Sequence, residues 1–200
     1  MDSEREPARG VSVARTIDHL RARTAAHHHD LESGLQIQER LSRVETRDRL
    51  IAGYLAFYGE VEAALKPHLW DVPDLAFSSR VRFRDLQGQA DLPPRGQLWV
   101  NPVFPEIGTR AEALGALYVL EGSTLGGRKI MQALRSQGVS TDNLYFLDPY
   151  GKDTGARWRS FLKILERETA SSETTMNACI SGAVKAFTFA TICLRAERTN

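Results

Sequence analysis

The segment GALYVLEGSTLGGRKIMQAL, residues 115–134, is the stretch that decides how this chain folds. Its apolar residues recur with the period of an α-helix, yet Gly122, Gly126 and Gly127 lie inside that pattern. A glycine in a helix interior costs roughly 1 kcal/mol against alanine, so the helix forgoes about 3 kcal/mol in all. Some feature of the fold or of a binding site must therefore require the absence of side chains here.

Three interpretations fit a glycine-rich segment of this kind. The glycines let two helices pack closely, or they leave bare backbone against which a flat ligand lies, with room for a diatomic molecule above a metal. The third is a strand followed by a phosphate-binding loop, GxxxxGK[ST]. That interpretation fails because Arg128 stands where the lysine belongs and Lys129 stands where the serine or threonine belongs. Close packing and a flat ligand both remain.

The rest of the chain also has helical periodicity. The helices that this periodicity predicts are, by residue number, 13–35, 44–65, 79–88, 109–134, 154–168 and 173–195. Thr109 is the expected N-cap of the glycine-rich helix, with Glu112 completing a capping box, and Pro67 is expected to follow the second helix. Residues 91–108 are rich in proline and glycine and predict a loop. We predict an all-α, single-domain helical bundle over residues 12–200, preceded by a flexible leader over residues 1–11.

Composition excludes several classes of function. Lys and Arg number 26 against 25 Asp and Glu, a net charge of +1, which argues against a nucleic-acid-binding face. The first ten residues contain no apolar core of a signal peptide. The longest apolar stretch, around Leu114 to Leu120, is far shorter than the about 20 residues that cross a bilayer. Cys179 and Cys193 are expected to be buried thiols in a reducing compartment. A soluble, cytoplasmic protein is expected.

A run of three histidines, His27 to His29, lies on the first predicted helix. With about 100° of rotation per residue, His29 faces water, whereas His27 and His28 flank the apolar stripe on opposite edges. Glu32 follows His28 by four residues and therefore lies on the same side of the helix. A carboxylate there can accept from Nδ1–H of His28 and leave Nε2 free for a metal. We therefore expect His28 to be a ligand; an exposed triplet or an adventitious metal site is the alternative.

The histidine helix and the glycine-rich helix together resemble those of the haem oxygenase family. In LRARTAAHHHDLE, Leu20, Thr24 and His28 fall at four-residue steps, like the leucine, threonine and iron-binding histidine of the family's proximal helix. YVLEGSTLGGRK resembles the glycine-rich distal helix, and ARWRSFLKIL resembles a later helix with basic contacts to haem propionates. The resemblance extends over about residues 15–195 and is closest to the bacterial branch associated with bacteriophytochromes.

This resemblance implies that haem lies between the proximal and distal helices. It assigns the iron to His28 and the orientation of the imidazole to Glu32. Gly122, Gly126 and Gly127 would let the distal helix approach the porphyrin and direct bound oxygen toward one meso carbon.

Four further residues lie at functional positions of the family. Arg21, Arg159 and Lys163 match basic residues that bind propionates, and the spacing of the last two puts them on one helix face. Ser123 is a departure, because many members carry an aspartate there that organises a water network for protonation of oxygen. A hydroxyl can position a water molecule but cannot hold charge.

The activity that the resemblance implies is oxidative cleavage of haem, both cofactor and substrate, to biliverdin, carbon monoxide and ferrous iron with molecular oxygen. Electrons must come from a ferredoxin or a flavoprotein reductase, since the chain has no flavin or nicotinamide fingerprint and too few cysteines for an iron–sulfur cluster. A bacteriophytochrome would receive the biliverdin. The alternatives are a haem carrier or sensor of the same fold without turnover, and a helical scaffold that binds no haem.

Overall fold

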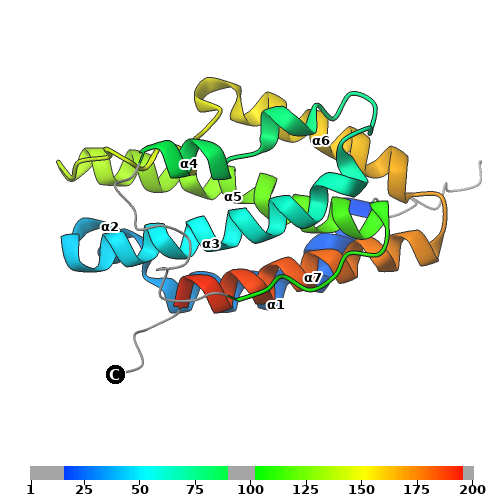
Figure 1. The fold of residues 1–200 in the computed structure, drawn as a ribbon, viewed down its shortest axis with the longest axis horizontal. Coiled ribbons are helices and arrows are strands. Elements are labelled where there is room, and N and C mark those ends of the chain that lie inside the picture. The colour runs from blue at the N-terminus through cyan, green and yellow to red at the C-terminus, as the bar shows by residue number, and fades with distance from the viewer. Residues whose placement is uncertain (1–15, 90–101, 196–200) are drawn as a thin grey trace, which may run out of the picture.

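The computed structural model describes residues 16–89 and 102–195, and within those ranges the regular structure is helical throughout (Figure 1). The α-helices are α1 Thr16–Leu35, α2 Ile37–Ser42, α3 Val44–Leu69, α4 Phe83–Gln89, α5 Arg110–Ser136, α6 Thr154–Thr169 and α7 Glu173–Arg195. Short 3₁₀ turns lie at Phe77–Arg80 (η1), Tyr145–Leu147 (η3) and Gly151–Asp153 (η4). The predicted all-α class is confirmed; the leader predicted for residues 1–11 lies outside the described residues.

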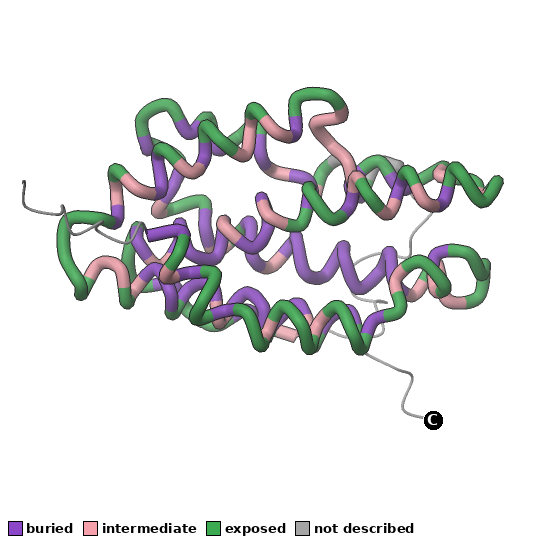
Figure 2. Tube along the Cα trace, turned by 180° about the vertical axis from the view of Figure 1, so that it is seen from behind, coloured by how far each residue is buried: buried purple, intermediate pink, exposed green. Residues whose placement is uncertain are grey.

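The core of the bundle forms around α7, which packs along α5, α1 and α3. In Figure 1, α7 and α1 lie side by side, and α3 and α5 run above them. Figure 2 shows buried positions on the helix faces that turn inward and exposed positions on the outer faces. The predicted stripe of α3 is buried in full, at Leu50, Tyr54, Phe57, Val61 and Leu65. Packing of such stripes rather than helix propensity stabilises a bundle of this kind.

Helix α7 is apolar enough, and at 23 residues long enough, to cross a membrane by length and composition, a candidate that the sequence analysis did not single out. In the folded chain, 56% of its most apolar window is buried inside the domain. Cys179 and Cys193 lie on this helix, and burial raises the pKa of each thiol to about 12. The apolar character of α7 is therefore accounted for by its position in the core.

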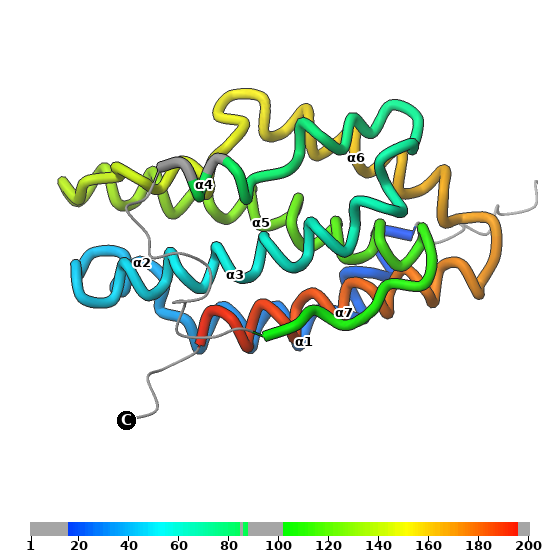
Figure 3. The backbone as a smooth tube through the Cα atoms, viewed as in Figure 1, coloured from blue at the N-terminus to red at the C-terminus, as the bar shows by residue number. Residues whose placement is uncertain are grey.

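The predicted N-terminus of the glycine-rich helix is confirmed. Thr109 Oγ1 accepts a hydrogen bond from the backbone N–H of Glu112 at 3.2 Å. The carboxylate of Glu112 accepts from the N–H of Gly108 at 2.9 Å, one residue before the partner that a capping box uses. The preceding stretch from residue 102 runs along α7 in Figures 1 and 3. Phe104 of this stretch packs edge to face against Phe189 of α7. Both contacts fix the point at which α5 enters the core.

The first predicted helix ends at Leu35 as expected, where Gln36 adopts a left-handed conformation with φ 43°. The short helix α2 that follows was not predicted, and two other predicted helices differ from the structure. The second predicted helix was expected to end before Pro67, but α3 continues to Leu69. A proline in the last turn removes one backbone hydrogen bond, and the complete burial of Leu65 and Leu69 offsets that loss.

The helix expected over 79–88 is divided in two, because Val81 has an extended backbone, with ψ 128°, between η1 and α4. Alternate residues of an extended segment point to the same side. Arg80 and Arg82 therefore both turn inward and are 2% exposed. A helical arrangement would have separated these two side chains by about 200°.

Glycines permit the close crossing of α5 on α7. A Cβ on Gly115 would overlap the backbone carbonyl of Cys179, and a Cβ on Gly182 would overlap that of Glu112. Both helices thus contact each other through backbone atoms. Neither glycine was singled out from the sequence.

We expect Gly115→Ala to destabilise the chain strongly, because the added methyl group meets rigid backbone rather than a flexible side chain. The free energy of unfolding should fall by about 3 kcal/mol, and Tm by roughly 6–12 °C for a chain of this size. Gly155→Ala is the control, since its Cβ meets only the guanidinium end of Arg159. Thermal melts of the two variants check this, and equal Tm values would contradict the proposed crossing.

Candidate functional site

A cavity of about 390 Å³ lies between the helices and is lined by residues of α1, α2, α3, α5, α6, α7 and η3. Its volume falls in the range of roughly 300–1,000 Å³ that small-molecule and cofactor sites occupy. Most of the wall is apolar or aromatic, and the large contributors are Phe57, Tyr58, Tyr118, Trp158 and Phe187. Such a cavity suits a large flat ligand.

Of the three histidines, His28 is the one that lines the cavity. Its Nδ1 lies 3.4 Å from Glu32 Oε2, and its ring meets Phe187 edge to face at a centroid distance of 5.8 Å. The His28 side chain is 57% exposed, so its ring remains accessible to a ligand. His27 and His29 do not line the cavity. The predicted pairing of His28 with Glu32 is therefore present, and metal binding by His28 remains a prediction.

The predicted glycines and Ser123 of α5 all line the cavity, but the glycines serve different purposes. A Cβ on Gly126 would have no atom within 4 Å, and one on Gly122 would lie 3.7 Å from the Trp158 ring. A Cβ on Gly127, in contrast, would overlap the carbonyl of Leu147 in η3. The two open interpretations of this segment thus apply at different positions: Gly127 allows close packing, and Gly126 leaves space in the cavity.

Two basic side chains line the cavity, Arg21 from α1 and Lys129 from α5. Arg159 and Lys163 are exposed on α6 and are not among the lining residues, so their predicted binding of propionates remains a prediction. Lys129 was not proposed as a site residue. A signal for it was present, because it follows Gly126 by three residues and so shares its helix face.

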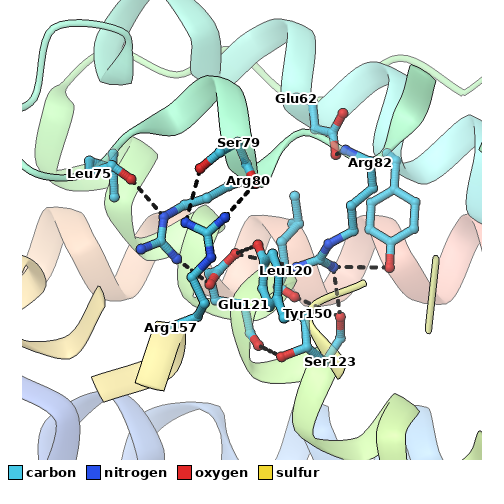
Figure 4. A network of polar contacts seen from close by, with 12 residues as sticks. Glu62, Leu75, Ser79, Arg80, Arg82, Leu120, Glu121, Ser123, Tyr150 and Arg157 are labelled. Carbon is cyan, nitrogen blue, oxygen red and sulfur yellow. Dashed lines mark hydrogen bonds and ion pairs between the residues drawn. The ribbon is translucent and has the colours of Figure 1, made fainter. Parts of the chain in front are cut away.

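Behind the α5 wall lies a buried ionic network that sequence analysis missed (Figure 4). The carboxylate of Glu121, with its side chain 0% exposed, accepts hydrogen bonds from Arg80 and from the hydroxyl of Tyr150, the latter at 2.7 Å. Arg82 Nη2 lies 3.4 Å from the same carboxylate. Removing one member of such a buried network leaves an uncompensated charge and lowers the free energy of unfolding by about 3–5 kcal/mol.

This network reaches the cavity through Arg82. Its Nη1 donates to the hydroxyl oxygens of Tyr58 at 3.2 Å and of Ser123 at 3.3 Å, and both residues line the cavity. Burial by itself lowers the pKa of Arg82, but the neighbouring Tyr58, Tyr150 and Glu121 raise that pKa above its ordinary value. Arg82 is therefore a permanent buried cation next to the cavity.

The fold is shared with a solved haem oxygenase. The structure of the NO- and CO-bound haem oxygenase from Neisseria meningitidis superposes with a TM-score of 0.70 over 92% of each chain, at 20% sequence identity. The present chain therefore has the all-α fold of that protein.

A relative found by sequence similarity is also a haem oxygenase. A haem oxygenase of Xanthomonas campestris pv. campestris (strain 8004) is 35% identical over 107 residues. These residues are 54% of this chain and span 64% of the length of the relative, slightly less than two thirds. No family model matches the chain.

The neighbouring glycines Gly126 and Gly127 provide a test of the site geometry. We expect Gly126→Ala to stabilise the protein without ligand by roughly 0.4–1 kcal/mol, since the added methyl group meets nothing and the unfolded chain loses entropy. Gly127→Ala should destabilise it by about 1–3 kcal/mol, because η3 must move. Urea unfolding of both variants measures the difference; destabilisation by Gly126→Ala would show that this residue is needed for packing.

Proposed function

We propose that this chain is a haem oxygenase, which cleaves haem to biliverdin, carbon monoxide and ferrous iron with molecular oxygen and electrons from another protein. The observation that carries the proposal is one cavity that brings together an accessible histidine on α1, His28, and bare helix backbone on α5 at Gly126. The similarity to the haem oxygenase of Xanthomonas campestris supports it.

The residues around the cavity fit haem. An imidazole on one wall suits the iron, and aromatic side chains from four helices suit the porphyrin faces. The cations Arg21 and Lys129 suit the two carboxylates of the propionates. Gly126 leaves room for a small ligand beside the helix.

Haem, when bound, supplies the redox chemistry and the activation of oxygen. His28 would hold the iron through Nε2, since Glu32 Oε2 lies 3.4 Å from Nδ1 on the other side of the ring and would orient the imidazole. The α5 backbone at Gly122 and Gly126 would limit where a small ligand can lie and so favour one meso carbon.

The partners follow from the same chemistry. A ferredoxin or a flavoprotein reductase supplies the electrons, and a bacteriophytochrome receives the biliverdin, in line with the resemblance of YVLEGSTLGG to the bacteriophytochrome-associated branch. Both partners place the protein in the cytoplasm.

Aerobic reduction of the haem complex tests the function. Haem titration should produce a Soret band, and addition of a ferredoxin, its reductase and NADPH should replace that band with bilin absorbance. The complex without reductant is the control and should be stable in air. A Soret band that persists through many reduction cycles would identify a haem carrier or sensor, and an absent Soret shift would identify a scaffold that binds no haem.

The His28→Ala variant tests the proposed iron ligand. We expect this substitution to remove the axial ligand and to abolish bilin formation, because no other histidine lines the cavity in the described part of the chain. Resonance Raman detection of the iron–histidine stretch measures the loss, and added imidazole should restore the ferric spectrum. His27→Ala and His29→Ala are matched controls that should retain the stretch. Loss of the stretch in His27→Ala, with His28→Ala unchanged, would refute the assignment.

A further inference from the structure

The two hydroxyl groups that share Arg82 differ in where their own protons go. Each hydroxyl has one proton to donate, and an arginine offers only donors. Ser123 Oγ accepts from Arg82 and donates its proton to the Leu120 carbonyl at 2.7 Å, within its own helix. Ser123 therefore has no proton left for a ligand in the cavity and can act there only as an acceptor.

Tyr58 is in the opposite situation. Its hydroxyl oxygen accepts from Arg82 Nη1 at 3.2 Å, and none of the hydrogen bonds among the described residues uses its proton. The contact with Arg82 occupies a lone pair and directs the O–H bond away from the guanidinium. Tyr58 lines the cavity, so the cavity is the space in which this proton can find an acceptor.

We propose that Tyr58 is the hydrogen-bond donor which the protein presents to an oxygen atom of a ligand bound in the cavity, and that Arg82 is the residue that positions it. This inference rests on the proposed function. It places the donor at Tyr58 and leaves Ser123, whose hydroxyl the sequence suggested could position a water molecule, as an acceptor.

Packing holds the Tyr58 ring in one place. The residue is 1% exposed, and its ring stacks on Tyr54 at 5.9 Å and packs against Phe57 at 5.4 Å and Phe146 at 6.4 Å. A side chain that is fixed in this way donates without the entropic cost of being ordered. The hydroxyl thus has a defined position before any ligand arrives.

The surroundings of Arg82 hold its guanidinium at the Tyr58 hydroxyl. Glu62 accepts the backbone N–H of Arg82 at 2.7 Å, and Glu121 lies beside Nη2 (Figure 4). Glu121 is shared with Arg80, so its charge compensates Arg82 only in part. A cationic donor to the phenol oxygen polarises the O–H bond and makes it a stronger donor.

Tyr54 provides a matched control. It lies one turn before Tyr58 on α3 and also lines the cavity, and its hydroxyl likewise has no hydrogen-bond partner among the described residues. Burial raises the pKa of the Tyr54 hydroxyl and the charge of Arg40 opposes that rise, but no hydrogen bond from an arginine to that hydroxyl is present among the described residues. Tyr54→Phe and Tyr58→Phe therefore delete the same atom in two adjacent turns.

The C–O stretching frequency of the ferrous carbon monoxide complex tests the proposal without turnover. A hydrogen-bond donor next to the ligand lowers this frequency, so Tyr58→Phe should raise it. Ser123→Ala should shift it less, and Tyr54→Phe should leave it close to that of the unmodified chain. The dissociation rate of oxygen from the ferrous complex should rise about 3- to 10-fold in Tyr58→Phe, the factor that one hydrogen bond supplies.

Each other outcome overturns the proposal. A shift in Ser123→Ala or Tyr54→Phe that equals or exceeds that in Tyr58→Phe assigns the donor elsewhere. An unchanged frequency in Tyr58→Phe, in a chain that binds haem and forms bilin, refutes the donor and leaves the proposed function intact. A chain that binds no haem refutes both. Tyr58→Phe retains the ring and its packing, and thermal melts of the unliganded variants check that the fold is preserved.

Discussion

The backbone contact between α5 and α7 is the constraint on which the rest of the structure depends. Gly115 and Gly182 lie where each helix meets the carbonyl groups of the other, and no side chain fits there. This contact determines how α5 is rotated about its own axis and how far it is shifted along α7. Because an α-helix turns by about 100° per residue, the directions of Glu121, Gly126 and Gly127 follow from it.

One helix thereby serves three purposes over its length. Its first turns pack on α7, its middle carries Glu121 into a buried ionic network, and its later turns present Gly126 to a cavity. The glycine pattern therefore has two explanations, since a Cβ on Gly127 would overlap the carbonyl of Leu147 in η3 and one on Gly126 would meet no atom within 4 Å. The helix tolerates its low propensity because tertiary packing stabilises it.

The buried charges connect the fold to the site. Arg80 and Arg82 approach Glu121 from a segment about 40 residues earlier in the chain. Burying charged side chains costs desolvation free energy, and a hydrophobic cluster of equal volume would often stabilise a bundle at least as well. Of these charges, Arg82 reaches the lining of the cavity, because its guanidinium donates to the hydroxyl oxygens of Tyr58 and Ser123.

The sequence by itself determined the features that depend on neighbouring residues. The helical class, the Thr109 cap, the buried stripe of α3 and the pairing of His28 with Glu32 all follow from spacing within one helix. Only the tertiary structure decided which charges are buried, because the partners of Glu121 come from other segments. It also decided which glycine faces another backbone and which faces a cavity, since that depends on what lies across from each helix turn.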